Sequence, residues 1–213
     1  MTKRPTEVGR HRFHGDPARF GAAADIVVAR FPQARYVADV AGGQGMLSRL
    51  LRKRHNVRSE VIDPRGWTLR GVPSRPEAFV ADMADHYDLV VGLHPDEALR
   101  EVVLAARRRP VLVVPCCNFW SATSRLGRDA LVESIRRFHT ARAGTAEMVN
   151  LGFAGPYNVG LVLVPPAVPG RPPAEPGSDE IVHGVRLGGR SQPGHAQQVL
   201  DRGQERVVVV RLG

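Results

Sequence analysis

Cysteine is scarce in this sequence of 213 residues, which holds only the adjacent pair Cys116 and Cys117. Neighbouring thiols cannot join distant parts of a chain, and a disulfide ring between them would be strained. We therefore expect both cysteines to be reduced and the protein to be intracellular and cytoplasmic. Two thiols are also too few ligands for zinc unless the fold brings others to them, so no metal site is expected.

Long apolar runs are missing as well. No stretch approaches the roughly 20 apolar residues that a membrane-spanning helix needs, so no membrane partner is expected. Residues 1–17 carry charge but lack the apolar segment of a secretory signal. Hydrophobic residues make up 43% of the chain and charged residues 24%, a balance typical of a globular protein with its own core.

Acidic residues are outnumbered, because 21 Asp and Glu stand against 30 Lys and Arg, a formal net charge of +9. Residues 49–75 hold eight basic and two acidic residues, and residues 100–142 hold nine and three. This charge lies in the middle of the chain and not in a tail. A folded surface that binds RNA or another polyanion is one interpretation. Arginine-rich codon usage together with solubility is the other.

Helix-like and strand-like segments alternate along the chain. Helices are expected where apolar residues recur every three or four positions, and strands where short β-rich runs end at Gly or Pro. The expected helices are 18–31, 45–55, 95–109 and 125–142, and the expected strands are 36–42, 59–64, 77–83, 87–94, 110–117, 146–153 and 158–166. This alternation predicts an α/β fold with a seven-stranded, mostly parallel, doubly wound sheet. The last two strands are expected to form a hairpin that adds a reversed terminal strand at one edge.

The chain divides by composition into four parts. Residues 1–19 form a loose lead-in, and residues 20–166 form the α/β domain. Residues 167–180 are rich in Pro, Gly and acid and are expected to be a linker. Residues 181–213 hold a few strand-like pieces and form a short C-terminal extension.

The most informative segment is a glycine-rich turn between the first expected strand and the helix after it. The strand carries Asp39, and Gly42, Gly43 and Gly45 follow; glycines allow a tight turn and a close approach of ligand to backbone. The second strand ends at Asp63, where a carboxylate can accept both hydroxyl groups of a ribose. A dinucleotide site would need a third glycine, and Asp39 would repel a pyrophosphate but attract an ammonium group. An ordinary tight turn and a dinucleotide site stay open as alternatives.

The residues V-A-D-V-A-G-G-Q-G at 37–45 resemble motif I of class I S-adenosylmethionine-dependent methyltransferases, commonly D/E-x-G-x-G-x-G, with Ala41 in place of the first glycine. The resemblance covers roughly residues 20–165. It implies that S-adenosylmethionine is the cofactor and that Ala41, Gly42, Gly43 and Gly45 form the turn that holds it.

The same resemblance implies roles for several acids. Asp39 would lie near the methionine end of the cofactor and Asp63 would hold the ribose hydroxyls. Ala81 and Asp82, after the third expected strand, would contact the adenine. Apart from the resemblance, Trp67, just past Asp63, is expected either to cover the adenine or to anchor its loop. The hairpin over residues 147–164 matches the reversed seventh strand of the family.

The acceptor side is expected at the ends of the fourth and fifth strands, which read G-L-H-P-D at 92–96 and P-C-C-N-F-W at 115–120. This pairing is similar to a methyltransferase group with His-x-Cys-Gly after strand four and a Cys-Cys pair after strand five, which includes a tRNA ribose methyltransferase. The Cys-Gly is missing here, so the substrate of that group is not carried over. The candidate catalytic residues are His94, Cys116 and Asn118.

The residues of the acceptor side each have two interpretations. His94 is a candidate general base, because the ordinary pKa of histidine lies near neutral pH, or a helix-start residue with local hydrogen bonds. Cys116 is a candidate nucleophile, because cytosine-C5 methyltransferases use a Pro-Cys thiol, or a small packing residue. Asp96 is expected to cap the following helix. Phe119 and Trp120 are expected to stack on a planar acceptor or to belong to a lid or core.

These features predict a methyltransferase whose acceptor is RNA, either tRNA or rRNA. The RNA expectation rests on the two basic stretches and the aromatic pair. The alternatives are a methyltransferase of a small natural product and a module that binds S-adenosylmethionine or RNA without turnover. Catalysis would consist mainly of positioning the reactants for in-line methyl transfer.

Overall fold

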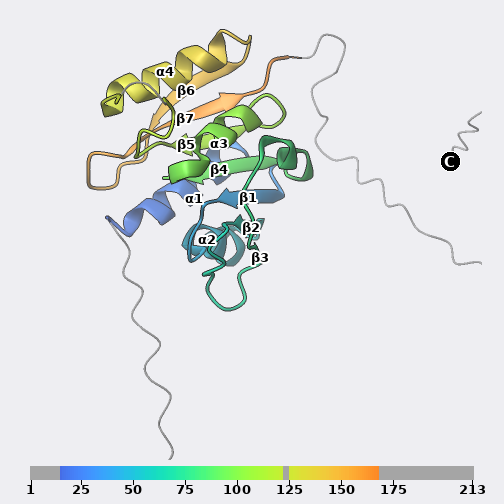
Figure 1. Cartoon of the computed structure of the whole chain (residues 1–213). Helices are drawn as coiled ribbons and strands as arrows, with labels where there is room; N and C mark the ends of the chain where they lie inside the picture. Colours follow the sequence, from blue (N-terminus) through green and yellow to red (C-terminus); the bar gives the residue numbers. More distant parts are fainter. Residues whose placement is uncertain (1–14, 122–124, 168–213) are drawn as a thin grey trace, which may run out of the picture. The chain divides into compact units, whose positions relative to one another are not determined.

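The computed structural model describes residues 15–121 and 125–167, which belong to the first of two compact units, Met1–Pro176. The expected extension at 181–213, nearly all of the expected linker and most of the lead-in lie outside the described residues. Seven strands form one sheet in the order β3-β2-β1-β4-β5-β7-β6 (Figure 1). Their bounds are β1 Tyr36–Val40, β2 Arg58–Ile62, β3 Ser74–Arg75, β4 Leu89–Leu93, β5 Val111–Val114, β6 Thr145–Asn150 and β7 Val159–Val164.

All strands of the described sheet run parallel except β7. β1 pairs in parallel with β2 and β4, β2 pairs with β3, and β4 pairs with β5. β7 runs antiparallel to both β5 and β6. The expected seven-stranded, doubly wound sheet is confirmed, and its order is that of the class I methyltransferase fold.

The hairpin of β6 and β7 lies at one edge of the sheet as predicted, and its reversed strand β7 is the inner of the two, between β5 and β6. Burial explains this placement. β7 has four successive buried residues and needs neighbours on both sides, whereas most residues of β6 are exposed. An exposed, partly polar strand suits the edge of a sheet.

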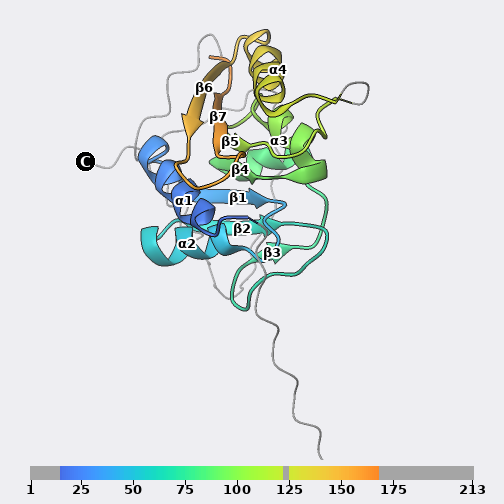
Figure 2. The same ribbon diagram turned by 90° about the vertical axis from the view of Figure 1, so that its left-hand side faces the viewer.

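Helices cover both faces of the sheet. In the described ranges they are α1 Ala18–Arg30, α2 Met46–His55, α3 Leu99–Ala105 and α4 Arg128–Thr140, with the short 3-10 helices η1 Ala81–His86 and η2 Asp96–Ala98. α1 and α2 pack apolar side chains such as Val27 and Leu51 against one face. α3 and α4 pack residues such as Val102 and Ile135 against the other (Figure 2). Within these ranges, no helix combines the length and the apolar character needed to cross a membrane.

The expected third strand at 77–83 is wrong. β3 lies earlier, where the backbone N–H of Asp63 donates to the carbonyl oxygen of Arg75 over 3.1 Å. Pro76 follows directly and has no N–H with which to continue the ladder. The apolar character of the later segment serves the core instead, since Phe79 and Ala84 are buried there.

Candidate functional site

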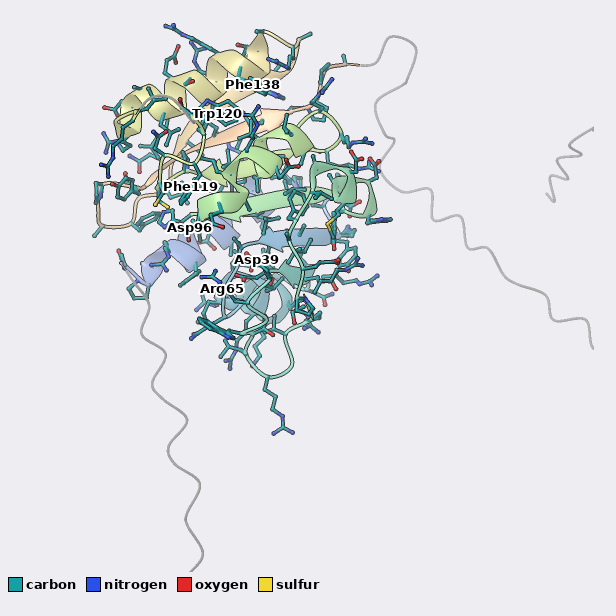
Figure 3. The ribbon with its side chains drawn as sticks, in the orientation of Figure 1. Asp39, Arg65, Asp96, Phe119, Trp120 and Phe138 are labelled. Atoms are coloured by element: carbon teal, nitrogen blue, oxygen red, sulfur yellow. The ribbon has the colours of Figure 1, made fainter. Side chains whose placement is uncertain are left out.

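The candidate site lies at the carboxyl ends of the central strands, on the left of Figure 1. After β1 the chain enters α2 on one face of the sheet, and after β4 it enters α3 on the other face. Where neighbouring strands send their connections to opposite faces, a crevice forms at their carboxyl ends, and doubly wound sheets bind ligands there. Figure 3 shows Asp39, Arg65, Asp96 and Phe119 toward this end of the sheet.

The glycine-rich turn between β1 and α2 needs small residues for two reasons. Ala41, Gly43 and Gly45 adopt positive φ angles of 53°, 56° and 75°, in the region that favours residues without a Cβ atom. At Gly42 the reason is a contact, because a Cβ there would lie 2.6 Å from the carboxyl group of Asp39. The turn therefore rests directly on Asp39.

Asp39 lies beneath this turn, with 1% of its surface exposed. Its Oδ2 accepts hydrogen bonds from the Ser48 backbone N–H (3.1 Å) and the Ser48 hydroxyl (2.9 Å), so it satisfies a donor in the first turn of α2. Burial raises the pKa of Asp39 to about 6, and the charge of Asp63 adds to the rise. The hydrogen bonds from Ser48 lower this pKa but do not outweigh burial. The carboxylate is thus directed at the start of α2 and not into the crevice.

Asp63 follows β2 at the same end of the sheet. Its Oδ2 accepts a hydrogen bond from the backbone N–H of Gly43 over 2.9 Å, so the fold brings the turn and this acid together. The space above Gly43 is open, because a Cβ there would meet only the Arg65 guanidinium, at 3.9 Å. Burial alone would raise the pKa of Asp63, but hydrogen bonds from Arg65 and Gly43 outweigh it and hold that pKa below its usual value. Asp63 is therefore ionised at neutral pH.

Arg65 is a residue of this site that sequence reasoning missed. Its Nε and Nη2 donate to the two oxygens of Asp63 over 2.9 and 2.7 Å. A ribose that binds this carboxylate would have to replace the guanidinium. The only signal in the sequence is the position of Arg65 two residues after the strand-ending acid, and in a chain with 30 Lys and Arg that signal is weak.

Ala81 and Asp82, the expected adenine contacts, lie at the start of η1. The Ala81 N–H donates to Glu101 over 2.9 Å. The Asp82 carboxylate accepts a hydrogen bond from Arg108, just beyond α3, over 2.7 Å. The structure therefore directs Asp82 toward α3 and does not bring its carboxylate to the glycine turn.

His94 follows β4 directly, with a positive φ of 57°. Its Nε2 lies 3.1 Å from the carbonyl oxygen of Tyr157, in the loop between β6 and β7. A neutral imidazole must donate this hydrogen bond, which leaves Nδ1 as the basic nitrogen. Burial lowers the pKa of His94, so the ring is neutral at pH 7 and can accept a proton at Nδ1.

The two thiols follow β5, with Cys116 half-buried and Cys117 exposed. Their sulfur atoms are 3.3 Å apart, and the Cys116 sulfur lies 3.5 Å from Oδ1 of Asp96. Burial raises the pKa of Cys116, and Cys117 and Asp96 raise it further, so this thiol is protonated at neutral pH. Asp96 was expected to cap the following helix. This prediction is wrong, because neither η2 nor α3 has a side-chain cap hydrogen bond.

The loop after β5 continues with Asn118, Phe119 and Trp120. Asn118 is half-buried and Phe119 is 47% exposed. Trp120 points inward, where its Nε1–H donates to the hydroxyl of Ser134 over 3.0 Å and its ring meets Phe138 edge-on at 4.9 Å. The aromatic pair is therefore divided: Trp120 packs against α4, and Phe119 is available to a ligand.

Two further exposed aromatic side chains lie on loops at this end of the sheet. Trp67 follows β2 and is 70% exposed, and Tyr157 lies between β6 and β7 and is 41% exposed. Together with Phe119 they offer planar apolar surface around the carboxyl ends of the strands. Planar apolar surface of this kind suits adenine and organic rings.

Only part of the first basic stretch lies at the crevice, where Arg65 binds Asp63. α2 begins at the carboxyl end of β1 and ends before β2, so its last residues lie at the opposite, amino edge of the sheet. A pocket of about 380 Å³ runs beside α2, from Arg49 near the start of the helix to Arg58 at the start of β2, and Arg52, Lys53 and Arg70 also line it.

Four of the nine arginines of the second basic stretch are in ion pairs within the domain. Arg108 pairs with Asp82 and Asp85, and Arg136 and Arg137 both pair with Glu133. Arginines near the crevice also have partners, since Arg65 binds Asp63 and Arg128 binds Asp129. The fold therefore presents much less free positive charge at the crevice than the sequence count suggested.

Neither the family models nor the curated protein sequences match this chain. Solved structures do resemble it. The sugar N-methyltransferase KedS8 from a Streptoalloteichus species has 17% identity over 77% of this chain and 100% of its own, with a TM-score of 0.48. The plantazolicin methyltransferase BpumL, in complex with a pentazolic desmethylPZN analogue and SAH, has 11% identity over 71% and 86%, with a TM-score of 0.49. The methyltransferase domain of bacterial CtHen1 has 13% identity over 70% and 97%, with a TM-score of 0.48. At such identities and TM-scores the likeness concerns the fold alone.

Proposed function

We propose that this chain binds S-adenosylmethionine at the carboxyl ends of β1 and β2 and transfers its methyl group to a small organic acceptor. One observation carries the proposal. In a sheet with the class I methyltransferase order, the Gly43 N–H donates to the Asp63 carboxylate over 2.9 Å, which joins the glycine turn to the strand-ending acid. A nucleoside-containing ligand needs this pairing of an exposed turn backbone with a ribose-binding carboxylate.

The described residues fit this cofactor. The backbone at Gly43 faces open space, so a ligand can approach it without meeting a side chain other than Arg65. Asp63 is ionised and can accept two ribose hydroxyl hydrogen bonds once the half-exposed Arg65 moves aside. Trp67 lies four residues beyond Asp63 and offers its exposed ring to the adenine.

Asp39 supports the site as a positioning residue. It holds Ser48 at the start of α2 and lies in contact with Gly42. The left-handed residues Ala41, Gly43 and Gly45 can keep their conformation only while α2 stays in place after the turn. Loss of the Asp39 contacts would therefore disturb the cofactor site without removing a group that touches the cofactor.

On the acceptor side, the chain supplies orientation and a proton acceptor. Bound S-adenosylmethionine provides a methyl group attached to a positively charged sulfur. His94, fixed through Nε2 by the Tyr157 carbonyl, holds Nδ1 ready to take a proton from an amine or hydroxyl acceptor. Asn118 offers a side-chain amide from the loop that follows β5. Cys116 is protonated at neutral pH and is poorly suited to act as a nucleophile.

A small acceptor fits the surface better than RNA. The exposed side chains at the carboxyl ends of the strands include the aromatic rings of Trp67, Phe119 and Tyr157. Five of the eight cations of the first basic stretch line a pocket beside α2, and four of the nine of the second are in ion pairs. An RNA bound at the crevice would need free cations along its backbone path, so the RNA expectation gains no support from the charges.

Calorimetric titration of the full chain with S-adenosylmethionine and, separately, with NAD tests the cofactor. Micromolar binding of S-adenosylmethionine is expected, with no binding of NAD. Asp63→Ala removes the acceptor of two ribose hydrogen bonds and is expected to weaken binding about 100-fold. Asp25→Ala is the matched control, because Asp25 lies exposed on α1.

Two results would contradict this proposal. Absence of S-adenosylmethionine binding by a folded wild-type protein would exclude the cofactor, and equal loss in both variants would show that Asp63 has no specific role.

The acceptor class is tested by titration with tRNA at 50 and 200 mM salt. Strongly salt-dependent tRNA binding that Phe119→Ala weakens would place RNA in the crevice and overturn the small acceptor.

A further inference from the structure

We propose that Asp96, Cys116 and Cys117 form a binding site for a thiophilic divalent cation such as Zn²⁺. One ligand atom from each of the three side chains lies within 4.8 Å of the others. Asp96 follows β4 and the cysteines follow β5, and these strands pair up to Leu93 and Val114 at their carboxyl ends. The sheet thus brings the carboxylate to the thiols from a position 20 residues away.

The separations suit a tetrahedral zinc site. With Zn–S bonds of about 2.3 Å and Zn–O bonds of about 2.0 Å, tetrahedral angles place two sulfurs about 3.8 Å apart and a sulfur and an oxygen about 3.5 Å apart. Here the two sulfurs are 3.3 Å apart, and the Cys116 sulfur lies 3.5 Å from Oδ1 of Asp96. The Cys117 sulfur also lies within 4.8 Å of the Asp96 carboxylate.

Asp96 is placed for ligation and not for helix capping. It has a positive φ of 46°, a conformation that aspartate tolerates better than most residues. Asp96 is the first residue of η2, and neither η2 nor α3 has a side-chain cap hydrogen bond. Its carboxylate instead approaches the Cys116 thiol.

Two arginines lie near the three ligands and can offset part of their negative charge. Two thiolates and a carboxylate carry a charge of −3, and a divalent cation leaves −1. Arg19 and Arg65 lie close enough to respond to this cluster. Hydrogen bonding to Asp63 chiefly raises the pKa of Arg65, and Asp96 adds to it. Burial lowers the pKa of Arg19, and the charges of Asp16 and Cys116 oppose that effect. These two cations can balance part of the residual negative charge, and the ion itself displaces the thiol protons when it binds.

Three protein ligands leave a fourth position for water or another ligand, as in zinc sites that take part in reactions and not only in folding. This position is at the carboxyl ends of β4 and β5, where the acceptor is placed under the proposed function. The ion would then hold a heteroatom of the acceptor and favour its ionised form. That role rests on the proposed function, whereas binding of the ion does not.

The test uses the reduced full-length protein and Co²⁺ as a spectroscopic substitute for Zn²⁺. Thiolate ligands give Co²⁺ an intense near-ultraviolet charge-transfer band, and the sequence contains no cysteines other than Cys116 and Cys117. The band therefore reports this site even if histidines elsewhere bind cobalt. One Co²⁺ per chain is expected, and one equivalent of Zn²⁺ should remove the band.

Three variants identify the ligands, and circular dichroism verifies that each is folded. Cys117→Ser removes an exposed thiol and should weaken Zn²⁺ binding more than about 100-fold, because even partners outside the ligand set change affinity 10- to 100-fold. Asp96→Asn should weaken it at least about tenfold. Glu97→Gln is the matched control, an exposed acid beside Asp96 but outside the cluster, and should change the affinity less than twofold.

The proposal is overturned if folded, reduced wild-type protein shows no charge-transfer band with equimolar Co²⁺. It is also overturned if Asp96→Asn and Glu97→Gln bind Zn²⁺ equally well, because the carboxylate would then be no ligand. The titration contains no S-adenosylmethionine. A failure of this site therefore leaves the cofactor result unchanged, and a failure of cofactor binding leaves this site intact.

Discussion

Replacing Asp39 by asparagine should change how the stability of this protein depends on pH. The carboxylate is buried, and its pKa rises from 3.8 to about 6 on folding. A raised carboxyl pKa means that the folded state prefers the protonated form. Protonated Asp39 therefore stabilises the folded state fully below about pH 4, and this stabilisation is lost as the pH rises through 6. The shift corresponds to about 3 kcal/mol of unfolding free energy at pH 7.

Asparagine removes this penalty but keeps the capping geometry. Its amide oxygen can accept both hydrogen bonds from Ser48, as the carboxylate oxygen does. Relative to wild type, Asp39→Asn should therefore gain about 3 kcal/mol in unfolding free energy between pH 4 and pH 7. Asp39→Ala lacks the acceptor and should lose about 1–2 kcal/mol relative to Asp39→Asn at every pH.

Urea unfolding at pH 4, 5, 6 and 7 measures these differences, with Glu97→Gln, an exposed acid away from the turn, as the control. A constant difference between wild type and Asp39→Asn from pH 4 to pH 7 would refute the reasoning, because Asp39 would then ionise as an exposed acid does. Calorimetry at pH 7 adds a second readout. S-adenosylmethionine affinity should stay within about threefold of wild type, and a 100-fold loss would show that Asp39 itself contacts the cofactor.

Three further substitutions test the turn and its surroundings. Ala41→Gly relieves a positive φ of 53° and should stabilise the fold by about 1 kcal/mol, seen as a rise of about 2–4 °C in Tm; a lower Tm would contradict this. Gly42→Ala places a Cβ 2.6 Å from the Asp39 carboxyl group and should lower both Tm and S-adenosylmethionine affinity, whereas unchanged values would show that the turn can shift. Arg65→Ala frees Asp63 from a half-exposed ion pair worth about 1 kcal/mol and should tighten S-adenosylmethionine binding about fivefold in calorimetry. Weaker binding would show that Arg65 contacts the cofactor.

Most of the fold could be predicted because its signals are local. The apolar runs of β1, β4 and β5 and the periodic helices around them were each recognisable within a window of a few residues. β3 could not be predicted, because a strand of two residues has no pattern of its own and exists through pairing with Val61 and Ile62. The place of β7 inside the sheet likewise follows from tertiary contacts, because its side chains are buried on both faces and its two edges pair with β5 and β6.

Some features of the candidate site could likewise be predicted from local sequence, and others only from the tertiary structure. The sequence by itself determined the α/β class, the glycine-rich turn at Gly42 and Gly43 and the acid that ends the second strand, because these depend on residue type and short spacing. Other features depend on contacts between segments and on the course of each helix across the sheet. The tertiary structure alone decided that Asp39 faces Ser48, that Arg65 covers Asp63 and that Asp96 meets Cys116. It also decided that α2 ends at the amino edge of the sheet, which places much of the first basic stretch away from the crevice.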